Sequence, residues 1–556
     1  MVMKTKPIDL KGSYIPGDPN AIMENLAYTR SEDDPVPAVP VMPYEGWNFL
    51  PTDYGYRSYF GTNAVLNVEL LPSRCDELLI IQSTSFSNIA VALCEDGIWT
   101  TNPGIAGSIW THAVVYSYSS SVHLQWTHVR INNQSYLYQA GRGTINLLSS
   151  VNVLSTFTPS FLNMAGQEGV FQAGGRLGMW DSAGSVSWSN IFDFSDFTPS
   201  LETLAGNAQF NSVLGDIIII KKHGDGFIIY ASASVTTVHQ SGTTTGLLWD
   251  AQPVATTSGI THAGEVTIGV SDMEHYVYTT QGLVVIKAYN SYMKQHDVSS
   301  GLTNVIDFIR ENKEPVFLKM MQGRYLFICL INPNYIHGIE SSYETTADTV
   351  GISQVYFRDD SECIYKDGTQ VFFSGSVVIP SVDFTIDTGA DLPAYPVFQG
   401  ALVFDTVYQK WGKCKGLFSQ VVDMTPSDAI STGVAGFTNF GMNVGVLQES
   451  GVIRLFDNRP ADSWLRWGKI GYSRLGFTQL FVAEAHFRSN STGTIELEGS
   501  LNGRDLNTLF YRSTAFNDTR KIEHTSGLSA RWHTIALRGQ WDFQYLGFAC
   551  KMAGIR

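Results

Sequence analysis

The chain lacks long apolar runs and clustered cysteines. No apolar stretch approaches the roughly 20 residues of a membrane-spanning helix, and the first residues do not lead into the apolar segment of a secretion signal. Its cysteines are scattered without a C-x-x-C pair, at Cys75, Cys94, Cys329, Cys363, Cys414 and Cys550. Zinc sites and disulfide frameworks need clustered cysteines, so we interpret these residues as reduced core side chains and expect no metal and no cofactor.

Catalytic motifs are also scarce. The 12 histidines show no metal-ligand spacing, and no nucleophile elbow or phosphate-binding loop stands in its required context. One segment, from Phe384 to Asp391, contains Asp387-Thr388-Gly389 and resembles the active-site loop of aspartic proteases. A single copy would work only in a homodimer that brings two aspartates together, and a strand ending in a turn explains the same residues. We therefore expect no enzymatic activity; the enzymatic alternatives are an aspartic protease-like or a glycan-hydrolysing protein.

A repeated unit is present: an apolar run, a tight polar turn, and a second apolar or aromatic run. Copies of it lie at Val91–Trp99, Leu177–Trp188, Ile217–Tyr230, Tyr276–Ile286, Cys363–Phe373, Ala401–Trp411 and Val446–Phe456. Asp-Gly and similar pairs supply the positive φ of a tight hairpin turn, and β-branched and aromatic residues fit a pleated surface. Repeated hairpins with aromatic residues are typical of a β-propeller. We predict an all-β chain.

Composition divides the chain into three parts. Residues 1–46 space their prolines so that the backbone is held extended, which indicates an arm. Residues 47–462 hold the hairpins and predict a propeller-like body. Residues 463–556 alternate strongly and predict a C-terminal antiparallel β-sandwich that serves as a platform. Helical spacing is found at Leu302–Asn312, and a short helix is considered around Ala21–Tyr28.

Charge is unevenly placed. The formal net charge is −15, but residues 464–556 carry 12 basic and 7 acidic side chains, a charge of +5, which leaves −20 for the rest. An acidic body argues against wrapping nucleic acid, although solubility alone also explains it. In a ring, the basic part would contact a neighbour's acidic flank. The candidate interface residues are Arg466, Lys469, Arg474, Arg488, Arg512, Arg520 and Lys521. The alternative is that these residues are solvated strand faces.

Several blocks resemble tail proteins of short-tailed bacteriophages. One block runs from Val186-Ser-Trp188 through Asp193 and Asp196 to Thr198-Pro199, followed by Leu214-Gly-Asp216 and Gly226–Tyr230. Further similar blocks are Gly400–Trp411, Gly468–Thr478, Gly499–Gly503 and Arg531–Phe543. The first 170 or so residues do not match. The resemblance implies a tail nozzle or tail-tube hub, a ring that is commonly six-fold and lies below the portal and adaptor.

The resemblance also implies partners. We expect a homo-oligomeric ring in the virion tail, made in the host cytoplasm, with head-tail adaptor or portal proteins above and tail fibre or tip proteins nearby. The genome would pass the acidic wall without sequence-specific binding. We also expect the chain to have no membrane-spanning segment. The binding-class alternative is a receptor- or glycan-binding tail protein. It would use the surface aromatics Tyr54, Tyr56, Tyr59, Trp110, Tyr116 and Tyr118, although core packing is the commoner use of such residues.

Overall fold

The computed structural model describes 34 segments of the chain. They are residues 6–7, 24–25, 43–52, 55–58, 64–65, 75–82, 88–94, 96–101, 109–115, 126–132, 134–139, 145–148, 154–241, 248–255, 258–269, 271–279, 282–289, 292–297, 316–321, 324–330, 353–354, 372–373, 401–414, 418–423, 444–448, 453–455, 463–467, 470–471, 476–487, 491–500, 508–517, 521–524, 529–530 and 532–555. The chain divides into two compact units, residues 1–331 with 400–556, and residues 332–399.

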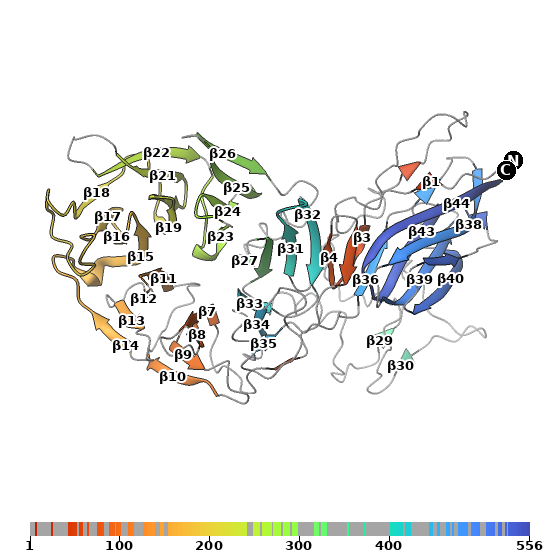
Figure 1. Ribbon diagram of the computed structural model, residues 1–556, viewed down its shortest axis with the longest axis horizontal. Helices are drawn as coiled ribbons and strands as arrows, with labels where there is room; N and C mark the ends of the chain where they lie inside the picture. Colours follow the sequence, from red (N-terminus) through yellow and green to blue (C-terminus); the bar gives the residue numbers. More distant parts are fainter. Residues whose placement is uncertain are drawn as a thin grey trace. The chain divides into compact units, whose positions relative to one another are not determined.

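Five antiparallel sheets of four strands follow one another along the first unit (Figure 1). The first is β7 (Cys75–Gln82), β8 (Asn88–Cys94), β9 (Gly97–Thr101) and β10 (Thr111–Val115). The second is β11 (Trp126–Ile131), β12 (Gln134–Gln139), β13 (Ile145–Leu148) and β14 (Leu154–Phe157). The third is β15 (Gln167–Ala173), β16 (Arg176–Asp181), β17 (Ser185–Trp188) and β18 (Gly206–Gln209). The fourth is β19 (Ile217–His223), β20 (Gly226–Ala231), β21 (Val235–Gln240) and β22 (Trp249–Ala255). The fifth is β23 (Val266–Ile268), β24 (Glu274–Thr279), β25 (Gly282–Tyr289) and β26 (Tyr292–Asp297).

Two further sheets combine strands from distant parts of the sequence. The sixth is β27 (Val316–Met321), β28 (Tyr325–Leu330), β31 (Ala401–Asp405) and β32 (Lys410–Cys414), extended by β4 (Phe49–Pro51) and β5 (Tyr56–Ser58). The seventh is β33 (Phe418–Asp423), β34 (Val444–Gln448), β35 (Ile453–Leu455) and β6 (Ala64–Val65). Its outer strand β6 therefore comes from the N-terminal side of the chain.

The seven sheets are the blades of a closed propeller. The first strand of each blade lies innermost, and neighbouring inner strands contact one another from β11 to β15 to β19, from β23 to β27 to β33, and from β33 back to β7. The remaining joints are apolar: Trp126 packs with Leu79 between the first two blades, and Ile220 packs with Val266 between the fourth and fifth. Contact between the seventh and first blades closes the ring, as propellers of four-stranded blades require.

Local residues explain the hairpins. Gly184 and Gly224 adopt φ angles of +77° and +57° in the turns after β16 and β19, a conformation that favours glycine. Aromatic side chains then fill the space between blades: the rings of Phe171 and Phe227 lie 4.7 Å apart, and Trp249 lies 5.2 Å from Phe227. Burial of these large side chains is the main stabilising contribution of the propeller.

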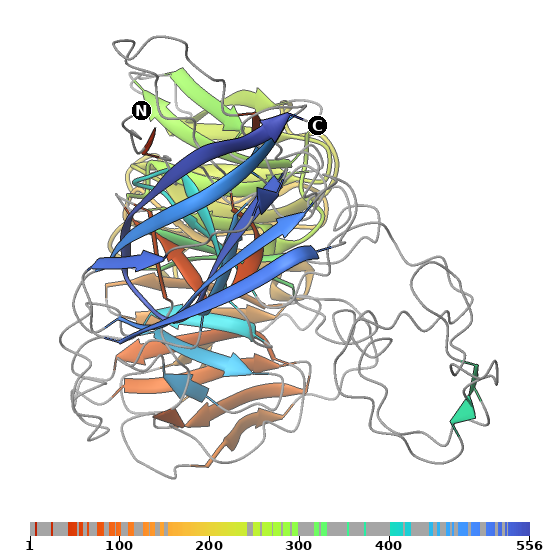
Figure 2. The same cartoon turned by 90° about the vertical axis from the view of Figure 1, so that its right-hand side faces the viewer.

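Residues 463–555 form two further sheets, whose long strands are drawn in blue in Figure 2. One contains β38 (Gly476–Phe487), β41 (Lys521–His524), β42 (Ser529–Ala530), β44 (Phe543–Ile555) and β1 (Lys6–Pro7). The other contains β36 (Ser463–Trp467), β37 (Ile470–Gly471), β39 (Thr492–Ser500), β40 (Thr508–Asn517), β43 (Trp532–Gln540), β2 (Glu24–Asn25) and β3 (Pro43–Trp47). Phe487 packs face to face on Phe516 at 4.4 Å, which joins the two sheets as a sandwich.

The N-terminal segment contributes strands to this sandwich. Strand β3 pairs with β36, β1 pairs with β44, and β2 runs parallel to β37. The short helix considered around Ala21–Tyr28 is wrong at Glu24 and Asn25, because their backbone groups pair with β37 instead. The helix predicted at Leu302–Asn312 lies outside the described residues.

The predicted fold class is confirmed: an all-β chain with a propeller-like body of hairpins, a C-terminal antiparallel β-sandwich and an extended N-terminal segment. The helical turns in the described part are two short 3-10 turns, η1 (Met164–Gly166) and η2 (Ala263–Glu265). The second unit contributes one described pair of strands, β29 (Ser353–Gln354) and β30 (Phe372–Phe373).

Candidate functional site

Of the seven predicted interface residues, one has a described side chain. Arg466 lies on β36, half buried, and forms an ion pair with Glu498 of β39. Two strands of the sandwich contain Arg512 and Lys521, while the other four residues (Lys469, Arg474, Arg488 and Arg520) lie outside the described residues. Their role in an interface stays a prediction.

The sheet that carries Arg466 has a second cation–carboxylate pair beside the first. Arg538 of β43 contacts Glu496 of β39 at 2.9 Å, and its guanidinium lies 5.1 Å from the ring of Trp464. These cross-strand pairs neutralise one another within the chain, and partly exposed pairs of this kind contribute little stability each. The two arginines and two glutamates on this sheet therefore balance one another, and the excess of positive charge comes from other residues of the segment.

The other sequence candidates fall in two groups. Tyr56 and Trp110 are buried in the core, so both follow the packing interpretation rather than that of sugar contacts. Tyr54, Tyr59, Tyr116, Tyr118 and the protease-like Asp387 lie outside the described residues. No group of three or more metal-ligating side chains is found in the described part of the chain.

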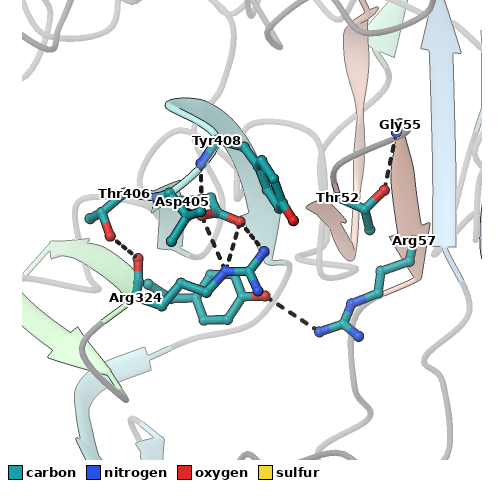
Figure 3. Close-up of polar contacts among 9 residues, drawn as sticks. Thr52, Gly55, Arg57, Arg324, Asp405, Thr406 and Tyr408 are labelled. Carbon is teal, nitrogen blue, oxygen red and sulfur yellow. Dashed lines mark hydrogen bonds and ion pairs between the residues drawn. The ribbon is translucent and has the colours of Figure 1, made fainter.

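A polar network ties together the strands of the sixth blade (Figure 3). Asp405, at the end of β31, is completely buried, and its carboxylate accepts hydrogen bonds from the Arg324 guanidinium at 2.7, 3.1 and 3.2 Å. The guanidinium also lies 4.9 Å from the rings of Tyr325 and Tyr408. This fork geometry is the strong form of an ion pair, and stacking on two rings orients the arginine further.

The network continues into the N-terminal strands. Arg57 of β5 donates to the Tyr325 hydroxyl at 3.5 Å. The next residue, Ser58, accepts a hydrogen bond from the Trp541 backbone N–H at 2.8 Å and donates to the Gly539 carbonyl at 3.4 Å. Residues 43–58 thus pair with the sandwich through β3 and with the sixth blade through β4.

The inner strands of the propeller line an axial cavity of about 390 Å³. Its lining includes six titratable side chains: Glu77 of β7, His128 and Arg130 of β11, Lys221 and Lys222 of β19, and Lys319 of β27. Pockets that bind small molecules fall in this range of volume. The cavity thus combines a suitable size with converging charged groups.

Burial changes the titration of this cluster. It lowers the pKa of His128 to about 4, with Glu77 opposing and Lys221 and Lys319 adding to the effect, so the imidazole is neutral at pH 7. Burial also lowers the pKa of Lys221, where Glu77 opposes and Lys319 adds to the shift. These four side chains therefore lie within electrostatic range of one another.

Sequence reasoning missed this cluster, although a signal was present. Lys221 follows the run Ile217–Ile220, and Lys319 follows Phe317 and Leu318 within an apolar strand. Lys319 has apolar neighbours on both sides, and lysine in such a strand is rarely buried without a reason. Which strands face the axis, however, depends on the order of the blades.

A second missed feature is the surface of the third blade. Phe161, Phe192 and Leu201 are 64%, 93% and 83% exposed, and Ile191 and Leu204 are also exposed. We call these five residues the blade-3 apolar surface. Four of them lie in the loop between β17 and β18, and a hydrogen bond from Ser160 to the Ser195 carbonyl holds the segment of Phe161 beside this loop. Large apolar side chains exposed on neighbouring segments are a feature of protein–protein contact sites.

Comparison with known proteins adds little to these observations. No protein-family model and no curated protein matches the chain. Similar solved structures include virginiamycin B lyase from Staphylococcus aureus (7% identity, 51% of this chain, 91% of that chain, TM-score 0.30). Others are the WD40 β-propeller domain of Doa1 (8%, 72%, 98%, 0.33) and the computationally designed Ika8 protein (10%, 71%, 100%, 0.35). TM-scores this low carry no argument about function, and the propeller assignment is based on the sheet topology.

Proposed function

We propose that this chain is a structural protein of a short-tailed bacteriophage tail. It forms one subunit of a ring, a nozzle or hub below the portal and adaptor, through which the genome is retained and released. In this proposal the chain acts by assembly, with no catalytic residue and no cofactor. The ring is commonly six-fold in the proteins that the sequence resembles, and head-tail adaptor proteins above and fibre or tip proteins nearby are its partners.

The observation that carries this proposal is the blade-3 apolar surface. Ile191 and Phe192 lie within the block from Val186 to Pro199 that carries the resemblance to tail proteins, and Leu201 and Leu204 lie just beyond it. Phe192 is 93% exposed, and burial of such an apolar side chain by a partner makes the free energy of association more favourable. A protein that works by assembly needs such surfaces.

The loop that presents this surface is held in place by its own polar residues. Asn190, Asp193 and Asp196 accept backbone N–H groups two residues further on, at 2.9 to 3.0 Å. The buried Arg176 also holds the loop, because its guanidinium donates to the carbonyls of Ser189 and Thr203 at 2.7 and 2.9 Å. Such local turns fix the backbone before binding, which lowers the entropy cost of association.

Charge supports the same proposal. Outside residues 464–556 the chain carries a formal charge of −20, so an acidic wall would repel phosphates and let DNA pass without binding. The C-terminal segment, at +5, would contact acidic neighbours and set the register between subunits rather than supply most of the affinity.

Oligomerisation of the purified full chain tests the surface. We expect the Phe192→Ser/Leu201→Ser double variant to assemble at least about tenfold more weakly in mass photometry or light scattering. Ile109→Ser is the matched control, since Ile109 is an exposed apolar residue of the first blade. Equal assembly of the double variant and the wild type would show that the blade-3 apolar surface is not the interface.

Localisation tests the assignment itself. Antibody labelling of particles viewed by negative-stain electron microscopy should place the chain on the tail axis below the portal. Labelling of peripheral fibres would favour the receptor-binding alternative, and absence from tails would reject a tail protein. Substitutions suit these tests better than deletion of residues 464–556, because deletion would leave β3 without its partner β36.

A further inference from the structure

The axial cavity contains positive charge that the described structure does not neutralise. Neither Lys221 nor Lys319 has an ion-pair or hydrogen-bond partner for its ammonium group among the described residues. Lys222, next in sequence, differs because it forms an ion pair with Asp272 at 2.5 Å. Within the described lining, the single carboxylate is that of Glu77. Three cationic side chains, counting Arg130, therefore face one anionic side chain and a neutral imidazole.

This excess is unusual for the chain that contains it. The protein as a whole carries −15, yet two inner strands, β19 and β27, bring Lys221 and Lys319 to the same axial cavity, and neither has an ion-pair partner in the part of the chain that the structure describes. Ammonium groups held close together without a counter-charge repel each other, a cost that an anion between them removes. A cavity of about 390 Å³ has room for a small anion together with water.

We propose that the axial cavity binds a compact dianion of the phosphate class, free or as the terminal phosphate of a small ester, through Lys221 and Lys319. Burial favours the neutral amine of Lys221, and a dianion beside it favours the ammonium form, so that two lysine ammonium groups match two negative charges. Lysine binds phosphate oxygens as a point charge without requiring a planar partner. His128 donates one ring N–H to an oxygen, and the Glu77 carboxylate opposes the two lysines and so lowers the affinity of the site for an anion. This site is independent of the proposed tail function.

Substitutions of the charged residues should change anion affinity in predictable directions. Lys221→Met and Lys319→Met should each weaken binding about tenfold or more, because each removes a charge-assisted hydrogen bond. Glu77→Gln should tighten binding, since it removes the opposing carboxylate. Lys287→Met is the matched control: Lys287 lies on β25 outside the cavity, where it pairs with Glu274 at 2.7 Å, and its loss should leave binding unchanged.

Isothermal titration calorimetry of the full chain with inorganic phosphate tests the proposal, with chloride at equal ionic strength as the reference. We expect saturable binding of phosphate with one site per chain, and none of chloride. A nucleoside monophosphate is the second probe: tighter binding than inorganic phosphate identifies an ester as the ligand, and weaker binding identifies the free oxyanion.

Two results would overturn the proposal. One is the absence of saturable phosphate and nucleotide binding by the wild type. The other is equal binding by the wild type and the Lys221→Met/Lys319→Met double variant. Since removal of two repelling charges is not expected to unfold the propeller, circular dichroism of the double variant separates loss of binding from loss of fold.

Discussion

The hydroxyl of Tyr230 and the Nδ1 atom of His275 lie 2.7 Å apart, and both side chains are completely buried. Tyr230 belongs to β20 and His275 to β24, so this hydrogen bond joins the fourth and fifth blades. The Nε2 atom of His275 lies 2.9 Å from the Lys222 carbonyl, an acceptor, and must carry the proton. Nδ1 therefore accepts, and the tyrosine donates.

Removal of this donor should destabilise the propeller. Tyr230→Phe leaves the buried Nδ1 without a partner, and we expect a loss of about 1–3 kcal/mol in the free energy of unfolding, measured by chemical denaturation. Tyr136→Phe is the control, because the Tyr136 hydroxyl donates to Gln134, an exposed residue, at 3.0 Å. Equal losses in the two variants would mean that the hydrogen bond between blades contributes no more to the free energy of unfolding than a partly exposed one.

Acid should weaken the fold through His275. Burial, with His223 nearby, lowers the pKa of His275 to about 3, against 6.5 for an ordinary histidine. Between these values the unfolded chain binds a proton that the folded chain does not, so the stability contributed above pH 6.5 is lost as pH falls towards 3. The slope is up to about 1.4 kcal/mol per pH unit.

Replacement of the imidazole measures this contribution. Denaturation of His275→Gln between pH 7 and pH 5 should show a shallower loss of stability than the wild type, because glutamine does not titrate. Identical slopes in the two proteins would contradict the assignment to His275.

Glu265 should act with the opposite sign. Burial raises the pKa of this carboxyl to about 7, although hydrogen bonds from Thr261 and His262 oppose the shift. The folded chain then holds a proton that the unfolded chain has lost. The contribution of Glu265 is complete below pH 4.5 and is lost as pH rises through 7, by up to about 1.4 kcal/mol per unit.

Glu265→Gln isolates this effect. The amide oxygen still accepts the backbone N–H groups of Thr261 and His262, and the amide nitrogen donates to the Thr261 hydroxyl. Melting temperatures should therefore favour the variant over the wild type more at pH 8 than at pH 5. A difference that stays constant with pH would show that Glu265 does not titrate in this range.

The hairpins of the propeller could be predicted because their causes are local. Turn residues such as Gly184 and Gly224 stand between runs of apolar residues, and the structure places a hairpin at both positions. Long-range pairing has no such local cause. Ser463 bonds to the Asn48 carbonyl across 415 positions of sequence, and no local pattern identifies that partner. The contribution of the N-terminal strands to the sandwich and the seventh blade was therefore not foreseen.

The candidate sites divide in the same way. The basic excess of residues 464–556 is a property of composition, but the pairing of Arg466 with Glu498 depends on the registers of β36, β43 and β39. The axial cavity is lined by six inner strands, β7, β11, β15, β19, β23 and β27, which meet only when the ring closes. Sequence therefore identified charged residues, while their partners required the fold.

The pair of Arg324 and Asp405 predicts that the two single substitutions will lower the free energy of unfolding by different amounts. Asp405 is completely buried, whereas the Arg324 side chain is 35% exposed. Removal of the arginine therefore leaves an unpaired buried carboxylate, and we expect Arg324→Met to cost about 3–5 kcal/mol in the free energy of unfolding. Asp405→Asn alone should cost less. The asparagine amide oxygen still accepts the hydrogen bond from the Val407 backbone N–H, which is 2.9 Å long in the wild type, and water can solvate the partly exposed Arg324 side chain.

Combination of the two changes should restore stability. In the Arg324→Met/Asp405→Asn double variant no buried charge is left, and the methionine retains contact with Tyr325 and Tyr408. We therefore expect the double variant to be more stable than Arg324→Met alone. Chemical denaturation of the wild type and the three variants gives the coupling energy between the two side chains. A double variant less stable than Arg324→Met would mean that the carboxylate stabilises this blade through its backbone contacts rather than through the arginine.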